Sequence, residues 1–191
     1  MLSFGIITII MRKQNSYILK NGAELIVREG APTDATACLA FIEKVSAQST
    51  FLTFGPGEFG LSVEEEEKVI TDKNARDNEL FLLGTLDNKI VSQLTVNSSQ
   101  RPRLRHAAEF GISVDASVWG LGVGTVMLQY LMNWANASPI VRKVNLQVLP
   151  QNERGIKLYE KFGFKIEGRK LRDNFQDGIY SDVLLMGKLI D

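Results

Sequence analysis

The sequence has little of the chemistry found in disulfide-bonded or metal-dependent proteins. Its 191 residues include one cysteine, Cys38, and one histidine, His106. A single cysteine excludes an intrachain disulfide, and no cysteines and histidines cluster with the spacing of zinc ligands. We therefore expect no metal site and a cytoplasmic, reducing environment in which Cys38 is a small buried hydrophobic residue.

The chain also lacks an excess of charge and a long apolar run. Lys plus Arg and Asp plus Glu both number 22, so no overall field attracts nucleic acid or an anionic membrane. The apolar segment 2–11 is about half the length of a membrane-spanning helix, and its basic residues follow it, unlike those of a signal peptide. We expect no nucleic-acid or membrane partner. We assign residues 1–15 to an N-terminal extension, of which 1–10 have no role in the fold, and 16–191 to one domain.

Strand and helix signals follow one another along the rest of the chain. Ser62 and Glu65 form a capping box at the start of a helix over 63–75, and Asp87-Asn88 is typical of a hairpin turn. The predicted strands are 23–28, 79–86, 89–97, 107–114, 144–149, 164–167 and 179–189, and the other predicted helices are 35–45, 123–137 and 152–162. This order predicts a single-domain α/β fold with a mixed sheet.

A Gly-x-Gly-x-Gly segment at 120–124 follows the 107–114 strand and continues into a helix. Glycines let the backbone approach a ligand, and the free amides of a helix start bind anions, so the segment suits a pyrophosphate; a tight turn is the alternative. No lysine precedes Thr125, as a nucleoside-triphosphate loop requires. The spacing and late position also differ from those of a dinucleotide-binding unit.

A second pattern, Asn-Glu-Arg-Gly-Ile-Lys-Leu-Tyr-Glu-Lys-Phe-Gly-Phe, occupies residues 152–164. With the glycine segment, Gly-Ile-Ser-Val at 111–114 and Asp-Gly-Ile-Tyr at 177–180, it resembles the GNAT acetyltransferase superfamily. The family pattern is Gln/Arg-x-x-Gly-x-Gly/Ala, then Asn-x-x-Ala-x-x-x-Tyr and Gly-Phe, and the resemblance covers about residues 16–190. It implies a GNAT-like mixed, mostly antiparallel central sheet flanked by helices, and an N-acetyltransferase that uses acetyl-CoA as acetyl donor.

The resemblance also implies a donor site. The backbone of Ile112 and Val114 would bind the pantetheine arm like an added strand. Asn152 would contact the same arm, cap its own helix, or both. Trp119 stands where the family usually has Arg or Gln, which removes one charged contact, and Gly155 replaces the commoner alanine. The backbone around the pyrophosphate would comprise Gly120, Leu121, Gly122, Val123, Gly124 and Thr125.

For catalysis, Tyr159 matches the family tyrosine beside the thioester sulfur, where a phenol can protonate the departing thiolate. Its alternative role is packing with Ile156 and Phe162. Glu109 is our candidate general base, directly or through water, and His106 is the alternative. Alternation along the strand places these two residues on opposite faces, so at most one faces the substrate.

Two surface features each have two interpretations. The basic run 101–106, which contains Arg101, Arg103 and Arg105, is either a solvated loop or a contact for an acidic substrate group or a CoA phosphate. The loop phenylalanines Phe51, Phe54 and Phe59 either wall the acceptor site or cover the core.

From these residues we predict direct transfer of an acetyl group from acetyl-CoA to a primary amine of a small molecule. The alternatives are a protein N-terminal acetyltransferase and a CoA-binding sensor or interaction module without turnover. The sequence leaves the identity of the acceptor open, as well as the choice between a monomer and a homodimer.

Overall fold

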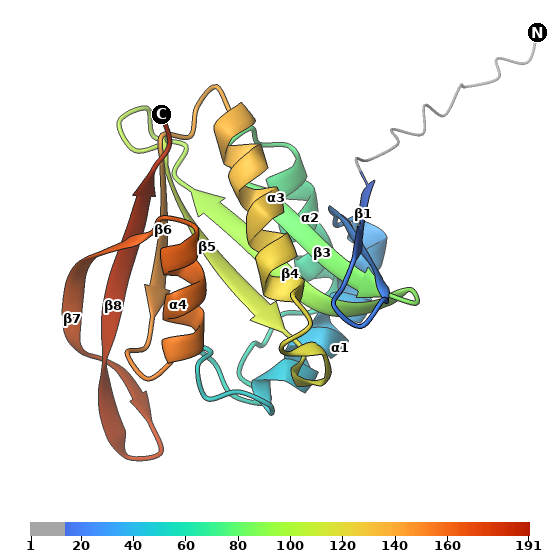
Figure 1. The fold of residues 1–191 in the computed structure, drawn as a ribbon, viewed down its shortest axis with the longest axis horizontal. Coiled ribbons are helices and arrows are strands. Elements are labelled where there is room, and N and C mark those ends of the chain that lie inside the picture. The colour runs from blue at the N-terminus through green and yellow to red at the C-terminus, as the bar shows by residue number, and fades with distance from the viewer. Residues whose placement is uncertain (1–13) are drawn as a thin grey trace, which may run out of the picture.

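A computed structural model describes residues 14–191. One eight-stranded sheet, in the order β1-β2-β3-β4-β5-β6-β8-β7, forms the centre of the molecule. Helices α3 and α4 lie on one face of the sheet and α1 and α2 on the other (Figure 1). The strands are β1 (Gln14–Ile18), β2 (Glu24–Glu29), β3 (Leu80–Leu86), β4 (Lys89–Ser98), β5 (Ala107–Val114), β6 (Lys143–Val148), β7 (Lys165–Gln176) and β8 (Ile179–Leu189). The helices are α1 (Ala35–Ser46), α2 (Val63–Asn74), α3 (Val123–Ala137) and α4 (Glu153–Lys161).

This architecture confirms the predicted single-domain α/β fold with a mostly antiparallel sheet. The local signals act as expected: the Glu65 N–H donates to Ser62 Oγ at 3.2 Å, and the Ser62 N–H donates to Glu65 Oε2 at 2.8 Å. Asp87 and Asn88 have φ angles of 47° and 61°, which the tight turn between β3 and β4 requires. Short-range chemistry therefore sets these boundaries.

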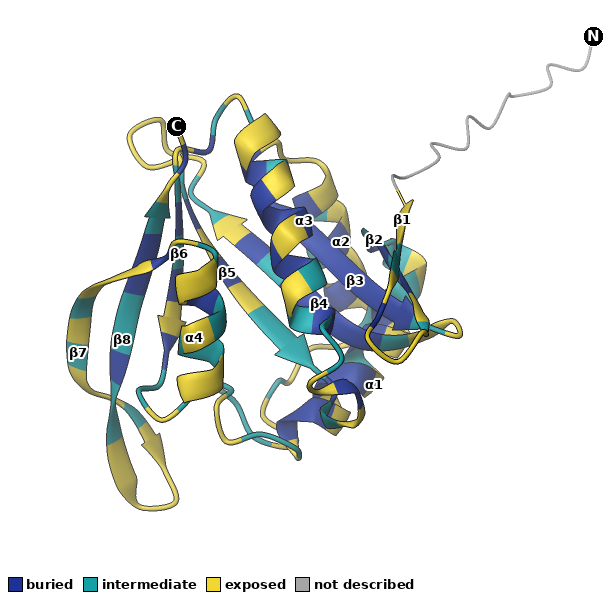
Figure 2. Cartoon of the chain, in the orientation of Figure 1, coloured by how far each residue is buried: buried dark blue, intermediate teal, exposed yellow. Residues whose placement is uncertain are grey.

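Two strands differ from the sequence prediction. β1 was not predicted, and its Gln14 and Asn15, which we had assigned to the extension, pair with β2. Residues 1–13, and with them the expected role of 1–10, lie outside the described residues. β7 continues to Gln176 instead of ending at 167. Both of its faces are largely exposed (Figure 2), so its polar sequence lacks the alternation by which a half-buried strand is recognised.

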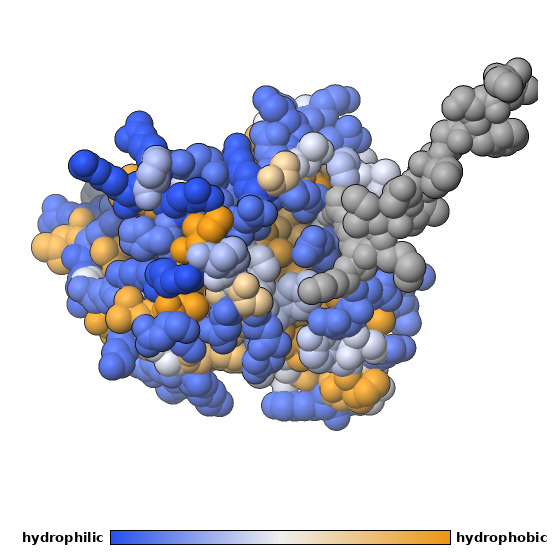
Figure 3. Space-filling model, turned by 90° about the horizontal axis from the view of Figure 1, so that it is seen from above, coloured by the Kyte–Doolittle hydropathy of each residue, from blue (hydrophilic) through white to orange (hydrophobic). Residues whose placement is uncertain are grey.

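The main core lies between the sheet and α3. Met127, Leu128 and Leu131 of α3 are fully buried against Leu82 and Leu94 of the sheet, and each such side chain contributes roughly 1.5–3 kcal/mol. A surface view from above is mostly hydrophilic, with apolar residues in scattered patches (Figure 3). Within residues 14–191, no helix is both long and apolar enough to cross a membrane.

A smaller core lies on the other face of the sheet, beneath α1 and α2. It contains Cys38 and Ile70 of the helices and Phe81 and Leu83 of β3. Burial raises the pKa of Cys38 to about 12. The thiol therefore stays protonated, which agrees with its predicted role as a small buried hydrophobic residue.

Candidate active site

The candidate site begins where β5 and β6 separate. These parallel strands pair only through Ala107–Glu109 and Lys143–Asn145. Beyond Glu109, β5 continues to Val114 paired with β4, while β6 continues paired with β8. The two strands diverge toward the N-terminal end of α3, and α4 lies over the region between them (Figure 1).

Backbone groups of β5 point into this separation. The Asp115 N–H donates to the Val91 carbonyl on the β4 side, and the His106 carbonyl accepts from the Arg142 N–H on the β6 side. Successive residues of a strand direct these groups to opposite edges, so the even positions face β6. Past the end of pairing these positions are Phe110, Ile112 and Val114. We call this unpaired edge, formed by Phe110, Ile112 and Val114, the open edge of β5. An extended ligand can pair with it as an added strand would, as the predicted pantetheine contacts of Ile112 and Val114 require.

The glycine segment brings an anion-binding helix start to one end of the open edge. Gly120 and Gly122 have φ angles of 85° and 103°, which residues with a Cβ atom rarely adopt. No side chain caps α3, and its first intrahelical bond runs from the Val126 N–H to the Gly122 carbonyl. The earlier amides, those of Val123, Gly124 and Thr125, therefore have no partner within the helix. Free amides at the positive end of a helix dipole fit a pyrophosphate.

Leu121 belongs to the same predicted set, but its backbone is already engaged. Its N–H donates to the Val118 carbonyl at 3.3 Å, and its carbonyl accepts from the Lys20 N–H at 3.2 Å. These bonds hold the glycine segment against the turn between β1 and β2. The backbone of Leu121 therefore holds the glycine segment in its conformation, and its N–H and carbonyl are used in doing so.

Asp115 anchors the start of this loop, a role that the sequence did not reveal. Its carboxylate is 2% exposed and accepts hydrogen bonds from Lys44 Nζ, from Gln48 Nε2 at 3.3 Å, and from the N–H and Oγ of Ser117 at 3.0 and 2.9 Å. Burial by itself raises the pKa of Asp115, but these donors more than offset it and lower the pKa to about 2. The pairing ties the end of β5 to α1.

Trp119 occupies the junction between the open edge and the glycine segment. Its side chain is 44% exposed, and the indole N–H donates to the Val114 carbonyl at 2.8 Å. That carbonyl is therefore occupied, which leaves the Val114 N–H for a ligand. The Arg154 guanidinium of α4 lies 5.6 Å from the centre of the Trp119 ring. Arg154 was not singled out in the sequence.

Asn152 caps α4, as one of its two predicted roles requires. Its Oδ1 accepts from the Gly155 N–H at 2.9 Å. A Cβ atom at Gly155 would lie 2.8 Å from Asn152 Nδ2, so the glycine at this position leaves room for the cap. The contact between Asn152 and pantetheine stays a prediction.

Tyr159, near the C-terminal end of α4, packs against the open edge of β5. Its side chain is 8% exposed, and its ring packs edge-on against Phe110 of the open edge at 5.8 Å and against Phe164 at 6.3 Å. Burial raises the pKa of Tyr159 to about 12, so the phenol is a proton donor at neutral pH. Among residues 14–191 its hydroxyl has no hydrogen-bond partner, which leaves that proton for a ligand.

Glu109 lies on the other face of the sheet, because it adjoins Phe110 in the strand. Its exposed carboxylate accepts from Gln147 Nε2 at 3.1 and 3.4 Å, and Gln147 Oε1 accepts from Lys170 Nζ at 3.0 Å. The sequence did not reveal Gln147 or Lys170, because the second lies in the part of β7 that was not predicted. Glu109 and Tyr159 thus flank the separation from opposite faces.

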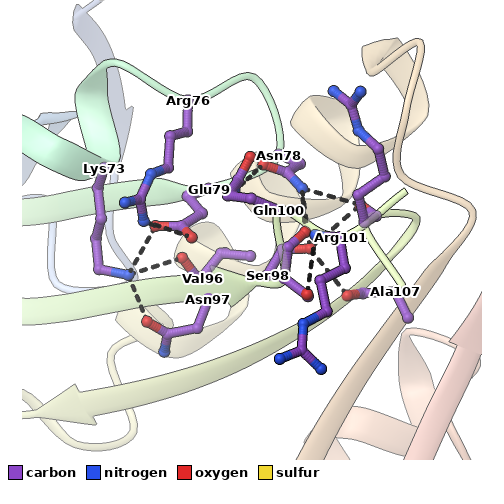
Figure 4. Close-up of polar contacts among 12 residues, drawn as sticks. Lys73, Arg76, Asn78, Glu79, Val96, Asn97, Ser98, Gln100, Arg101 and Ala107 are labelled. Carbon is purple, nitrogen blue, oxygen red and sulfur yellow. Dashed lines mark hydrogen bonds and ion pairs between the residues drawn. The ribbon is translucent and has the colours of Figure 1, made fainter. Parts of the chain in front are cut away.

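His106 and the basic run lie at the other end of β5. His106 is exposed, and its carbonyl pairs with β6. Asn78 Nδ2 holds the loop by donating to Ser98 Oγ at 3.0 Å and to the Arg105 carbonyl at 2.9 Å (Figure 4). The eight residues of β5 put this loop about 25 Å from the other end of the strand, where the segment that leads to Gly120 begins. This distance favours the interpretation of the run as a solvated loop over a contact with a CoA phosphate at the glycine segment.

Two of the three loop phenylalanines take the second expected role, that of covering the core. The rings of Phe54 and Phe59 lie 5.1 Å apart, and both pack against Phe41, Ile42 and Val45 of α1. They therefore cover a core, whereas Phe51 remains 41% exposed.

Two further features bear on where chemistry can occur. Within residues 14–191, no three His, Cys, Asp or Glu side chains are grouped so as to hold a metal ion. A hollow of about 610 Å³ lies away from the strand separation, between the end of α2 and α3, and is lined by Arg76, Glu79, Tyr130 and Trp134 among others. It contains none of the predicted site residues, so the strand edges and free amides define the candidate site.

Comparison with known proteins identifies the family. Residues 47–164 match the family described as "Acetyltransferase (GNAT) family". An L-amino acid N-acetyltransferase of Escherichia coli (strain K12) is 32% identical over 108 residues, which span 56% of this chain and 67% of that protein. A spermidine N(1)-acetyltransferase of Vibrio cholerae is 28% identical over 150 residues, 78% of this chain and 85% of that protein.

Solved structures share the fold. An acetyltransferase of the GNAT family from Streptococcus pneumoniae has a TM-score of 0.85 at 35% identity and covers 87% of this chain and 99% of its own. A phosphinothricin acetyltransferase from Sinorhizobium meliloti, solved in complex with acetyl-CoA, has a TM-score of 0.76 at 14% identity and covers 91% and 89%. With the family match over most of its length, the chain belongs to the GNAT family of N-acetyltransferases.

Proposed function

We propose that this protein transfers an acetyl group directly from acetyl-CoA to a primary amine of a small molecule. The observation that carries the proposal is the open edge of β5, which ends beside the free amides of α3. An extended pantetheine arm fits the backbone groups of Ile112 and Val114, and the pyrophosphate fits the amides of Val123, Gly124 and Thr125. Asn152 contacts the arm from the start of α4.

The thioester then lies at the strand separation, between Tyr159 and Glu109. The neutral amine attacks the thioester carbonyl carbon, so that a C–N bond forms and the C–S bond breaks. Glu109, directly or through water, takes the proton from the amine nitrogen, and Tyr159 gives a proton to the departing sulfur, which leaves as the thiol of CoA. Gln147 and Lys170 orient the Glu109 carboxylate. No covalent enzyme intermediate is required.

The acceptor class follows from the relatives and from the open face beside Glu109. The two curated relatives described above are named for small molecules that carry amines, an L-amino acid and spermidine. The exposed position of Glu109 lets an amine approach from the face opposite α3 and α4. We place the enzyme in the cytoplasm, where acetyl-CoA is present and a protein with one buried cysteine needs no disulfide.

The first test is ligand binding, followed by turnover. Saturating acetyl-CoA should raise the melting temperature, because it binds only the folded state, whereas ATP and NAD should not. Release of free thiol should then depend on an amine from a panel of amino acids, polyamines and peptides with free N-termini. A thermal shift without thiol release from any amine would favour a sensor, and acetylation of the peptides alone would favour an N-terminal acetyltransferase.

The role of Tyr159 is tested by Tyr159→Phe, which keeps the ring and removes the hydroxyl. We expect kcat to fall about 10²-fold or more, the usual contribution of a general acid, with little change in stability. Tyr180→Phe on the exposed β7–β8 hairpin is the matched control and should keep full activity. Unchanged turnover in Tyr159→Phe would remove Tyr159 from the acid role.

A further inference from the structure

Arg154 has no partner that accounts for its charge. The side chain is exposed on the first turn of α4, and among residues 14–191 its guanidinium has no hydrogen-bond or ion-pair partner and lies over the ring of Trp119. Its neighbours behave differently: Glu153 and Lys157 form an ion pair at 3.7 Å. A guanidinium has five N–H donors in a rigid plane, and here all of them are available to a ligand.

The packing of α4 and the ring of Trp119 direct Arg154 toward the glycine segment. One turn further along α4, Leu158 packs so closely on the start of α3 that a Cβ atom at Gly124 would lie 3.2 Å from it. Residues four apart lie on the same helix face, so Arg154 projects along the face that is turned toward the glycine segment. Trp119, whose indole is tied to the Val114 carbonyl at 2.8 Å, gives the guanidinium a flat surface to stack on.

We propose that Arg154, stacked on Trp119, binds a phosphate of the acetyl donor. This inference rests on the acetyl-CoA binding proposed above. Trp119 carries no charge, so the cation of this site comes from α4, across the strand separation, and the indole orients it. A planar guanidinium binds a phosphate through two parallel N–H···O bonds. The free amides of α3 bind the same group of phosphates from the other side.

The test is calorimetric titration of CoA into wild-type protein, Arg154→Gln and the control Lys157→Gln. Lys157 is on the same helix and is also exposed, and we assign it no role in the site. We expect Arg154→Gln to weaken CoA binding about tenfold, the effect of one charge-assisted bond, and Lys157→Gln to leave Kd unchanged. The dependence of Kd on NaCl should become shallower in Arg154→Gln. Equal melting temperatures establish that the variants are folded.

Shortened ligands identify the phosphate. Pantetheine, which has none, should bind Arg154→Gln and wild type equally. If the effect of Arg154→Gln persists with 3′-dephospho-CoA, the partner is the pyrophosphate, and if it disappears, the partner is the 3′-phosphate; both results support the proposal. Trp119→Leu should weaken CoA binding, and adding Arg154→Gln to it should cost less than in wild type, because the orientation is already lost.

Three results would overturn the proposal. Wild-type affinity for CoA in Arg154→Gln would exclude a phosphate contact, an equal loss for pantetheine would indicate a purely structural role, and strictly additive effects of the two substitutions would exclude orientation by Trp119. Failure of the wild-type protein to bind CoA at all would instead refute the proposed function.

Discussion

Asp115 should be a large single contributor to stability at neutral pH, and Asp115→Asn measures that contribution. The substitution keeps the shape and one acceptor for the Ser117 N–H but removes the charge that pairs with Lys44. The pKa of Asp115 falls from an ordinary 3.8 to about 2 on folding, which corresponds to about 2–3 kcal/mol of stabilisation. We expect Asp115→Asn to lower the melting temperature by about 4–10 °C.

The pH dependence separates this contribution from a general packing defect. Because the folded-state pKa lies below the unfolded-state value, the stabilisation is complete above about pH 4 and is lost as the pH falls from there toward 2. Urea unfolding followed by circular dichroism, from pH 7 down to pH 3, should show the free energies of the two proteins converging at the acid end.

A substitution in an exposed ion pair shows how small the change in unfolding free energy should be when a charge pair is not buried. Glu153→Gln removes an exposed ion pair with Lys157 and should change the free energy of unfolding by no more than about 0.5 kcal/mol. Equal stability of Asp115→Asn and wild type at pH 7, or a deficit that stays constant down to pH 3, would refute the reasoning from the Lys44 pairing.

Three further predictions concern the site and the core. Glu109→Gln should lower kcat about 10²-fold while the KM for acetyl-CoA stays near the wild-type value, and steady-state rates equal to wild type between pH 7 and 9 would leave the base to water or another group. Gly122→Ala should raise the KM for acetyl-CoA about tenfold, because a φ angle of 103° strains a residue with a Cβ by roughly 1–2 kcal/mol; an unchanged KM would contradict the role of this turn. Cys38, buried and with its pKa raised to about 12, should resist iodoacetamide at pH 8 in the folded protein and react in urea, and mass spectrometry showing rapid labelling of the native protein would contradict its burial.

Local patterns in the sequence were sufficient for most elements. α3 and β5 were predicted within a residue of their observed bounds, because one-sided burial imposes a period that is visible in the order of residues. The capping box at Ser62 and the turn at Asp87-Asn88 were found for a related reason, since each is a short-range hydrogen-bond or backbone requirement. The motif pair at 119–124 and 152–164 likewise gave the family.

The parts that escaped prediction depend on contacts between distant residues. Lys44 and Asp115 are 71 positions apart, and no local rule connects them. The Lys170, Gln147 and Glu109 chain joins three strands whose adjacency is set only by the sheet order. β7 was underestimated because its hairpin is exposed on both faces and has no period to detect.

The sequence by itself thus determined most of the elements and the glycine segment, because these follow from local conformation and periodic burial, and its motifs identified the family by their resemblance to known acetyltransferases. Only the tertiary structure decided which of the candidate residues lie close together. The strand separation after Glu109, the exposed cation of Arg154 on Trp119 and the placement of Tyr159 against Phe110 arise when strands and helices far apart in the chain pack together. Which side chains then meet depends on the packing of the whole sheet, which no short stretch of sequence encodes.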